Sequence, residues 1–190
     1  MFLTRERRRI VAAVALVAAG VTGAGATTMV RMNLDQLTAA ASTVARVRCV
    51  ENHTVAADGS LWTMTTFEVV ESLKGTAPAR ITVRLVGGRT AGASVRVEGV
   101  PRFEPGEELY LFLEPNRKGE FTVSGWAQGT FRVRRAEGSE IVSQDTGGVF
   151  LFDPATRQYR PGGARSLPVS EFKQHVREAT ERLSNKGRQQ

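Results

Sequence analysis

Between residues 62 and 88 the sequence alternates between apolar and polar side chains in two consecutive runs, and this pattern constrains the fold most strongly. A period of two over such lengths is typical of half-buried β-strands. Gly75 and Pro78 separate the two runs and favour a short turn. We therefore expect an antiparallel hairpin at the centre of the fold. Its inward-facing residues would be Phe67, Val69, Ile81, Val83 and Leu85.

The N-terminus has the pattern of a secretory signal. Four arginines precede an apolar run that begins at Ile10, and a small-residue stretch ends at Ala26. We expect residues 1–26 to be a signal peptide, and the protein to be exported to the periplasm or the extracellular space, with no stable membrane insertion after cleavage. A retained anchor is the alternative, although Ala and Gly insert weakly. Residues 7–11 also fit a loose twin-arginine pattern, so the export route stays open.

The charge and the cysteine content place few demands on the mature chain. The full sequence has 26 basic and 19 acidic residues, but four of the arginines belong to the predicted signal peptide. The mature chain is then only mildly basic, which requires neither a nucleic acid nor a membrane as partner. Cys49 is the single cysteine, so an intramolecular disulfide is impossible. We expect Cys49 to be buried on a strand, with a reactive thiol as the alternative.

Short strands with few helices are expected along the mature chain. Asn33 is a good N-cap with Gln36 at the third helical position, which predicts a short helix up to Ala41. Alternation predicts a strand at 44–50, connected to the central hairpin by residues 52–60. Further strands are expected at 109–113, 121–123, 131–133 and 149–152. The order predicts a mainly β domain over residues 27–165, either a small closed or partly open antiparallel β-barrel or a sandwich.

The C-terminal piece, residues 166–190, is predicted to be a helix and a polar tail. Ser170 is the expected N-cap, and apolar residues at helical spacing form one stripe of an amphipathic helix. We expect the helix to pack on the β domain, with docking to a partner protein as the alternative. The stripe consists of Phe172, Val176, Ala179 and Leu183.

The sequence offers few parts for catalysis or cofactor binding. The two histidines, His53 and His175, lie in no metal-binding pattern, and we expect neither a metal nor another cofactor. The glycines of residues 87–92 do not form a phosphate-binding loop, so no nucleotide is expected. Glu107 and Glu108 follow a Pro-Gly turn, where acidic residues solvate a loop. We therefore expect a non-enzymatic protein.

Six arginines occupy strand faces opposite the apolar residues. Adjacent strands would align them in one row, a candidate basic face for a polyanion. The alternative is a solvated surface on which Glu68 and Glu98 are interleaved with the arginines. Aromatic partners for base stacking are scarce there, which disfavours nucleic acid. The six are Arg46, Arg48, Arg84, Arg96, Arg132 and Arg134.

Two motifs carry a resemblance to a known group of proteins. They are T-x-F-x-V-x-x-x-L-K-G at residues 65–75 and G-x-P-x-F-x-x-G-E-x-L-x-L-F-L at residues 99–113. Over residues 33–133 the chain resembles bacterial exported proteins whose predicted fold is similar to the OB-like barrel of tissue inhibitors of metalloproteinases and netrin-type modules. The resemblance implies an extracytoplasmic, non-enzymatic OB-like barrel with flanking helices. It does not imply their inhibitory mechanism, because the expected mature terminus is Thr27 and Cys49 has no second cysteine.

A complete β core without an assembled catalytic set favours an exported binding module that recognises a protein or peptide. The contact would involve a barrel face, the loop 87–101 or the C-terminal helix. One alternative is an inhibitor or accessory factor of a secreted protease, which rests on fold resemblance alone. The other is an envelope polyanion-binding protein, which rests on the arginine row.

Overall fold

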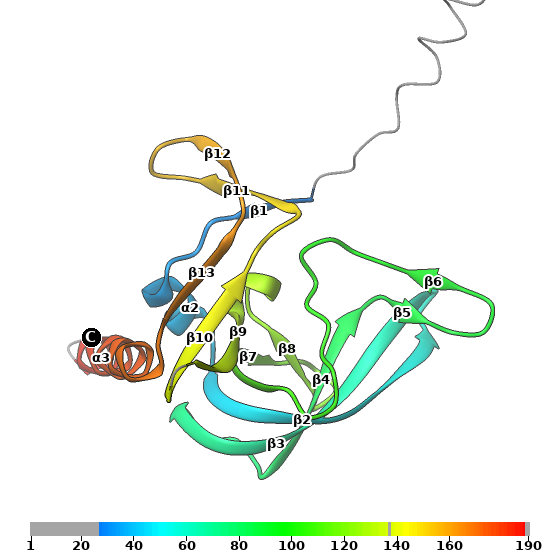
Figure 1. Ribbon diagram of the computed structural model, residues 1–190, viewed down its shortest axis with the longest axis horizontal. Helices are drawn as coiled ribbons and strands as arrows, with labels where there is room; N and C mark the ends of the chain where they lie inside the picture. Colours follow the sequence, from blue (N-terminus) through cyan, green and yellow to red (C-terminus); the bar gives the residue numbers. More distant parts are fainter. Residues whose placement is uncertain (1–26, 137, 189–190) are drawn as a thin grey trace, which may run out of the picture.

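The computed structural model describes residues 27–136 and 138–188, which form a mainly β fold with two α-helices (Figure 1). The predicted signal peptide lies outside these residues. The helices are α2 (Leu34–Ala40) and α3 (Val169–Gly187), and η1 (Trp126–Gly129) is a 3-10 turn. The strands of the main sheet are β2 (Thr43–Ala57), β3 (Ser60–Lys74), β4 (Arg80–Val86), β7 (Glu108–Pro115), β8 (Phe121–Val123), β9 (Thr130–Ala136), β10 (Ser139–Asp145) and β13 (Ala164–Pro168). One smaller sheet contains β1 (Thr27–Val30), β11 (Val149–Asp153) and β12 (Gln158–Pro161). The other contains β5 (Gly88–Arg89) and β6 (Ser94–Val95).

Five strands of the main sheet close into a ring of pairings. Strand β2 pairs with β3, β3 with β4, and β4 with β8 in parallel. Strand β7 pairs with β2 along one edge, while its other edge pairs with β9 near the start and with β8 near the end. The predicted central hairpin is therefore present as β3 and β4. Its turn contains Gly75, whose φ of 66° favours glycine and where a Cβ would collide with the backbone oxygen of Ser42.

The interior of the ring is an apolar core. The alternating residues predicted to face inward from β3 and β4 lie here, and Cys49 is buried among them as predicted. Phe103 closes one end of this core and packs edge-on against Phe67, with ring centroids 5.0 Å apart. The buried members are Ala45, Val47, Cys49, Phe67, Ile81, Val83, Leu85, Phe103, Leu109, Leu111, Leu113 and Val123.

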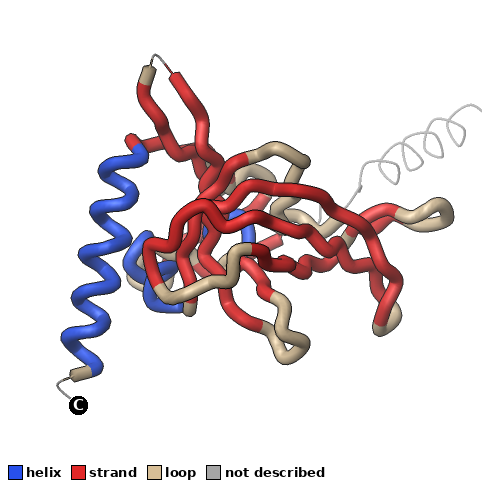
Figure 2. Tube along the Cα trace, turned by 90° about the horizontal axis from the view of Figure 1, so that it is seen from below, coloured by secondary structure: helices blue, strands red, loops and turns tan. Residues whose placement is uncertain are grey.

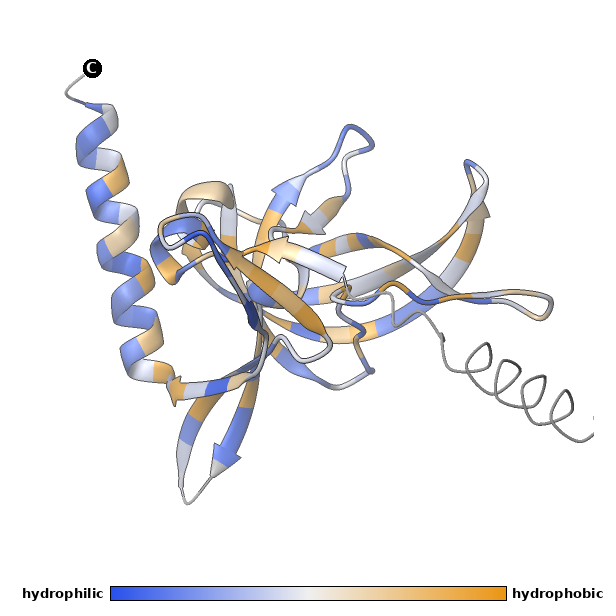
Figure 3. Ribbon diagram, turned by 90° about the horizontal axis from the view of Figure 1, so that it is seen from above, coloured by the Kyte–Doolittle hydropathy of each residue, from blue (hydrophilic) through white to orange (hydrophobic). Residues whose placement is uncertain are grey.

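A second apolar core lies outside the ring, between the sheet and the two helices. Both helices lie on one side of the strands (Figure 2). Phe172 of α3 is fully buried and contacts the rings of Tyr110 and Phe131, each at a centroid distance of 4.9 Å. Apolar and hydrophilic residues recur along α3 (Figure 3), as the amphipathic stripe predicts. Of that stripe, Phe172, Val176 and Ala179 are buried, whereas Leu183 is exposed. The C-terminal helix therefore packs on the β structure.

The predicted cap of α2 is confirmed. Asn33 Oδ1 accepts a hydrogen bond from Gln36 N, and Gln36 Oε1 accepts one from Asn33 N, both at 2.8 Å. This reciprocal capping box satisfies two amide groups that the first turn leaves free.

Two boundaries predicted from the sequence are wrong. The connection expected at 52–60 is mostly strand, because β2 continues to Ala57 and turns back only at Asp58 and Gly59. Ser170 is not the N-cap of α3, since Val169 is already helical and buried. Pro168, with φ −58° and ψ 142°, precedes the helix instead. Its ring fixes φ in the range that leads into the first turn.

The sheet formed by β1, β11 and β12 projects from the body of the molecule (Figure 1). The buried Gln128 of η1 attaches it, because its Oε1 accepts from Met32 N at 2.8 Å and its Nε2 donates to Val30 O at 2.9 Å. Neither helix in the described residues is long and apolar enough to cross a bilayer.

Candidate functional site

A pocket of about 400 Å³ lies between the β2–β3 hairpin and the segment that leads from β4 to β7. Residues 87–104 of this segment form one wall and carry the small β5–β6 arm (Figure 1). Phe103 separates the pocket from the interior of the ring. The pocket therefore continues the inner face of the strands beyond the point where the apolar core ends.

The hairpin supplies hydroxyl groups to the pocket. Thr54 lies opposite Thr63, and Thr63 opposite Leu85, so both threonines share the inward face with the apolar core. Thr63 Oγ1 donates to Gly87 O at 2.8 Å, and Thr54 Oγ1 accepts from Arg89 N at 3.3 Å. A Cβ at residue 88 would lie 2.5 Å from Thr54 Oγ1, so only glycine allows this close approach. The two threonines thereby hold the segment against the hairpin.

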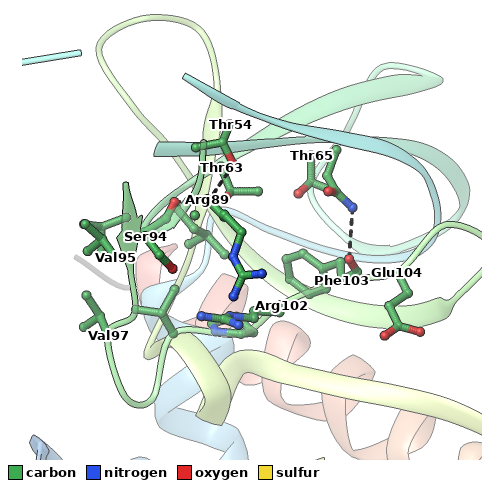
Figure 4. A pocket seen from close by; sticks show the side chains of 17 residues that line it. Thr54, Thr63, Thr65, Arg89, Ser94, Val95, Val97, Arg102, Phe103 and Glu104 are labelled. Atoms are coloured by element: carbon green, nitrogen blue, oxygen red, sulfur yellow. Dashed lines mark hydrogen bonds between the residues drawn. The ribbon is translucent and has the colours of Figure 1, made fainter. Parts of the chain in front are cut away.

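Two arginines contribute positive charge to the pocket. The side chains of Arg89 and Arg102 extend toward each other across it, whereas Glu104 points away (Figure 4). Neither guanidinium has a hydrogen bond or a carboxylate partner within residues 27–136 and 138–188. Like charges that converge in this way repel each other unless an anion lies between them.

The backbone that carries Arg102 is fixed in place. Asn52 Nδ2 donates to Phe103 O at 3.0 Å, and Arg132 Nη2 donates to Arg102 O at 2.7 Å. The Arg132 guanidinium also forms an ion pair with Glu107, with Nε 3.2 Å from Oε1. Guanidinium groups held on such a fixed backbone match the planar geometry of a carboxylate. The arrangement is suited to binding an anionic group that also hydrogen-bonds to hydroxyls.

The structure brings Arg46 and Arg48 together on the outer face of β2, where both bind Glu108 of β7. Arg46 also binds Glu140 of β10 at 2.8 Å, and its guanidinium is largely buried. The hydrogen bonds that Arg46 donates to Glu140 raise the pKa of Arg46, and the bonds that Arg48 and Arg46 donate to Glu108 lower the pKa of Glu108. These two arginines are therefore neutralised by carboxylates. The prediction that Glu108 merely solvates a loop is wrong.

The other arginines of the predicted row do not join these two. Arg132 lies opposite Leu109, an inner-core residue, so Arg132 and Arg134 are on the opposite face of the sheet from Arg46. Arg84 is two strands away from Arg46, and Arg96 lies in the loop before β7 with Glu98 2.8 Å from its Nε. The six arginines thus form no single row.

A second hollow, of about 330 Å³, surrounds Arg84 on the side of β4 that faces away from the core inside the ring. The guanidinium carbon of Arg84 lies 4.2 Å from the centre of the Trp62 ring. Arg117 and Lys118, from the turn between β7 and β8, line the same hollow, as does Asp58. Asp58 lies 3.4 Å from Arg84 Nη2 and 3.5 Å from Lys118 Nζ, which offsets part of the positive charge.

The remaining candidate groups of the sequence lie outside both hollows. Burial raises the pKa of the Cys49 thiol to about 11, which disfavours the reactive thiolate. His175 pairs with Asp35 at 2.9 Å, where α3 passes α2. The described residues contain no group of three or more His, Cys, Asp or Glu side chains placed to hold a metal ion.

No family model matches this chain, and no curated protein matches it by sequence. The function of the site is therefore inferred from its geometry.

The sequence had indicated the loop 87–101 as a contact surface but had not indicated Arg89 and Arg102. Arg89 belongs to the two-residue strand β5 and Arg102 to irregular chain, and neither stretch is long enough or regular enough for a periodicity to mark a face. The available signal was the Gly87-Gly88 pair, which permits close packing on the hairpin.

Proposed function

We propose that this protein is an exported, non-enzymatic binding module that recognises an acidic peptide segment of a partner protein through the pocket of Arg89 and Arg102. The observation that carries the proposal is the pair of guanidinium groups that face each other without a carboxylate partner in the described residues. A carboxylate placed between them would relieve their repulsion and accept hydrogen bonds from both. The threonine hydroxyls would pair with polar groups of the same peptide.

We propose further that the ring of β2, β3, β4, β8 and β7 is an OB-like barrel. The cyclic order of these strands and the parallel pairing of β4 with β8 support this part of the proposal. OB folds are five-stranded, partly open barrels that use loops and one strand face for binding. The resemblance noted over residues 33–133 points to the same architecture.

The composition of the pocket favours binding over catalysis. Among its lining residues Glu104 is the single carboxylate, and no histidine accompanies the threonines or Ser94. General acid–base or nucleophilic catalysis requires a base within hydrogen-bond reach of the reacting group. The anchoring of Arg102 through its backbone is, in contrast, what a preorganised binding site needs.

The proposal is tested by panning the purified protein against displayed random peptides and titrating the selected peptides by calorimetry. We expect the selected peptides to be enriched in Asp and Glu. The double variant Arg89→Gln/Arg102→Gln should bind them at least about tenfold more weakly, because each charge-assisted hydrogen bond contributes about 1.5–3 kcal/mol.

Arg134→Gln is the matched control, since Arg134 is also exposed and lies outside the pocket. It should leave peptide affinity unchanged. Selected peptides without acidic residues, or equal affinity for the double variant and the parent protein, would contradict the proposal.

Polyanion binding is a second candidate, favoured by the grouping of Arg84, Arg117 and Lys118 around Trp62. Binding to heparin that weakens with salt and is lost in Arg117→Gln/Lys118→Gln would support it.

Protease inhibition rests on the family resemblance alone. Unchanged activity of secreted proteases in the presence of the protein would argue against it.

A further inference from the structure

One edge of β2 has no strand partner over the second half of the strand. On the other edge, β3 pairs with β2 up to Ala57, where the hairpin turns back. The pairing of β2 with β7 ends at Arg48, and the last backbone hydrogen bonds on that side are those of Cys49. Within residues 27–136 and 138–188, no backbone group pairs with residues 52–56 on this side. We call this side of residues 52–56 the open edge.

The register of the hairpin shows which backbone groups face the open edge. The turn between β2 and β3 has two residues, so the pair that flanks it, Ala57 and Ser60, is hydrogen-bonded. Hydrogen-bonded and non-hydrogen-bonded pairs alternate in an antiparallel ladder, so Asn52, Thr54 and Ala56 direct their N–H and C=O groups away from β3. The stretch contains no lysine or proline, the residues that commonly protect an edge strand. An unprotected edge of this kind is a template for an added strand.

The open edge borders the pocket, and both pocket arginines are anchored to it. Asn52 Nδ2 donates to Phe103 O at 3.0 Å, which fixes the residue that follows Arg102. Thr54 Oγ1 accepts from Arg89 N at 3.3 Å. The side chains of Asn52 and Thr54 line the pocket, while their backbone groups face the open edge. A strand added along this edge would therefore direct alternate side chains into the pocket, where the two guanidinium groups face each other (Figure 4).

Charge decides between the two occupants that could form such a strand. Arg89 and Arg102 have no carboxylate partner in the part of the chain that the structure describes. A second copy of this chain, paired through the same edge, would bring a second pair of arginines to the contact and add repulsion. An extended acidic peptide would supply the missing carboxylates instead.

We propose that the acidic peptide binds in extended conformation, as an added β-strand that is hydrogen-bonded to the backbone of Asn52, Thr54 and Ala56. This mode of binding rests on the proposed function and adds a constraint on the peptide. Its acidic residues occupy alternate positions, because only every second side chain of a strand faces the pocket.

The test is a scan of single N-methyl groups along a peptide that binds the unaltered protein. The probe is the tightest acidic peptide from the panning described above, synthesised with one backbone N-methyl group at each position in turn and titrated by calorimetry. Where the peptide N–H faces β2, the methyl group removes a hydrogen bond and blocks the approach of the strands. We expect affinity to fall about tenfold or more at every second position and to stay unchanged at the positions between them.

A substitution in the open edge tests the same contact from the protein side. Ala56→Pro removes an N–H that the β2–β3 ladder does not use, as proline on an edge strand can. Ala56→Ser is the matched control because it keeps this N–H. We expect Ala56→Pro to bind the unmethylated peptide at least about fivefold more weakly and Ala56→Ser to bind it as the parent does. Circular dichroism checks that both variants fold.

Three results would overturn the added strand. A peptide that tolerates N-methylation at every position, or loses affinity at consecutive positions, would do so while leaving peptide binding by Arg89 and Arg102 intact. Equal affinity of Arg89→Gln/Arg102→Gln and the parent protein would remove the proposed function and this mode of binding with it. A dimer that sedimentation detects in the parent protein but not in Ala56→Pro would show that a second copy covers the open edge.

Discussion

Lys74 shows how one side chain joins two elements that are distant in sequence. Its Nζ lies 2.5 Å from Thr38 O and 2.6 Å from Ala41 O, so a residue at the end of β3 satisfies carbonyls at the end of α2. Those carbonyls have no partner within the helix. Burial lowers the pKa of Lys74, which shows that the charge is partly desolvated and that the hydrogen bonds must compensate.

We expect Lys74→Met to lower the free energy of unfolding by about 1–2 kcal/mol, because it keeps the apolar stem but leaves two carbonyls unpaired. Urea denaturation followed by circular dichroism measures the change. Lys118→Met is the control, since Lys118 is 58% exposed and its ion pair with Asp58 is long. It should change stability by less than about 0.5 kcal/mol. Equal effects of the two substitutions would show that the α2 contact contributes nothing specific.

The packing of α3 on the second apolar core, which lies outside the ring, is the main contact between a helix and the sheet. Phe172 contacts three aromatic rings of the sheet, and we expect Phe172→Ala to cost about 3–5 kcal/mol by leaving a cavity. Leu183→Ala, on the same stripe but exposed, should cost less than about 0.5 kcal/mol. Thermal and urea unfolding of both variants test this. Small losses in both would mean that α3 does not stabilise the fold and is available for a partner.

The elements were predictable where one face is apolar and the other polar. The β3–β4 hairpin and the α3 stripe satisfy this condition, whereas residues 52–57 of β2 do not, because their inward face carries polar side chains such as Asn52 and Thr54 that line the pocket. The pair Asp58-Gly59, which favours a two-residue hairpin turn, was the local signal for the true end of β2. The pocket itself was not predictable, because its arginines come from chain without periodicity.

At the scale of the whole molecule, the outer strands are attached to the ring by one charged network as well as by apolar packing. Arg46 of β2 binds Glu108 of β7 and Glu140 of β10, and Arg48 also binds Glu108. Alternation had indicated correctly that Arg46 and Arg48 face away from the inner core. It could not indicate which arginines would be neutralised, because their partners come from strands about 60 and 94 residues away in sequence.

This network makes stability depend on pH in a defined direction. Hydrogen bonds from Arg48 and Arg46 hold the pKa of Glu108 below its ordinary value of 4.5, and Arg46 lowers that of Glu140. A carboxylate whose pKa is depressed by folding stabilises the native state fully above its unfolded pKa. That contribution is lost as the pH falls from about 4.5 through the folded pKa. We therefore expect the free energy of unfolding to fall steeply below about pH 4.5.

Glu108→Gln should reduce both the stability at neutral pH and its dependence on acid. We expect a loss of about 1–3 kcal/mol at neutral pH, because Arg46 is largely buried and loses one of its two carboxylates. The curves of variant and parent should converge at low pH, where Glu108 is protonated in both states of the parent. Glu68→Gln is the control, since its pair with Arg80 is exposed on both sides, and its curve should run parallel to that of the parent. Urea unfolding across a pH series measures all three curves, and a Glu108→Gln curve that stays parallel to the parent would show that the network does not cause the acid sensitivity.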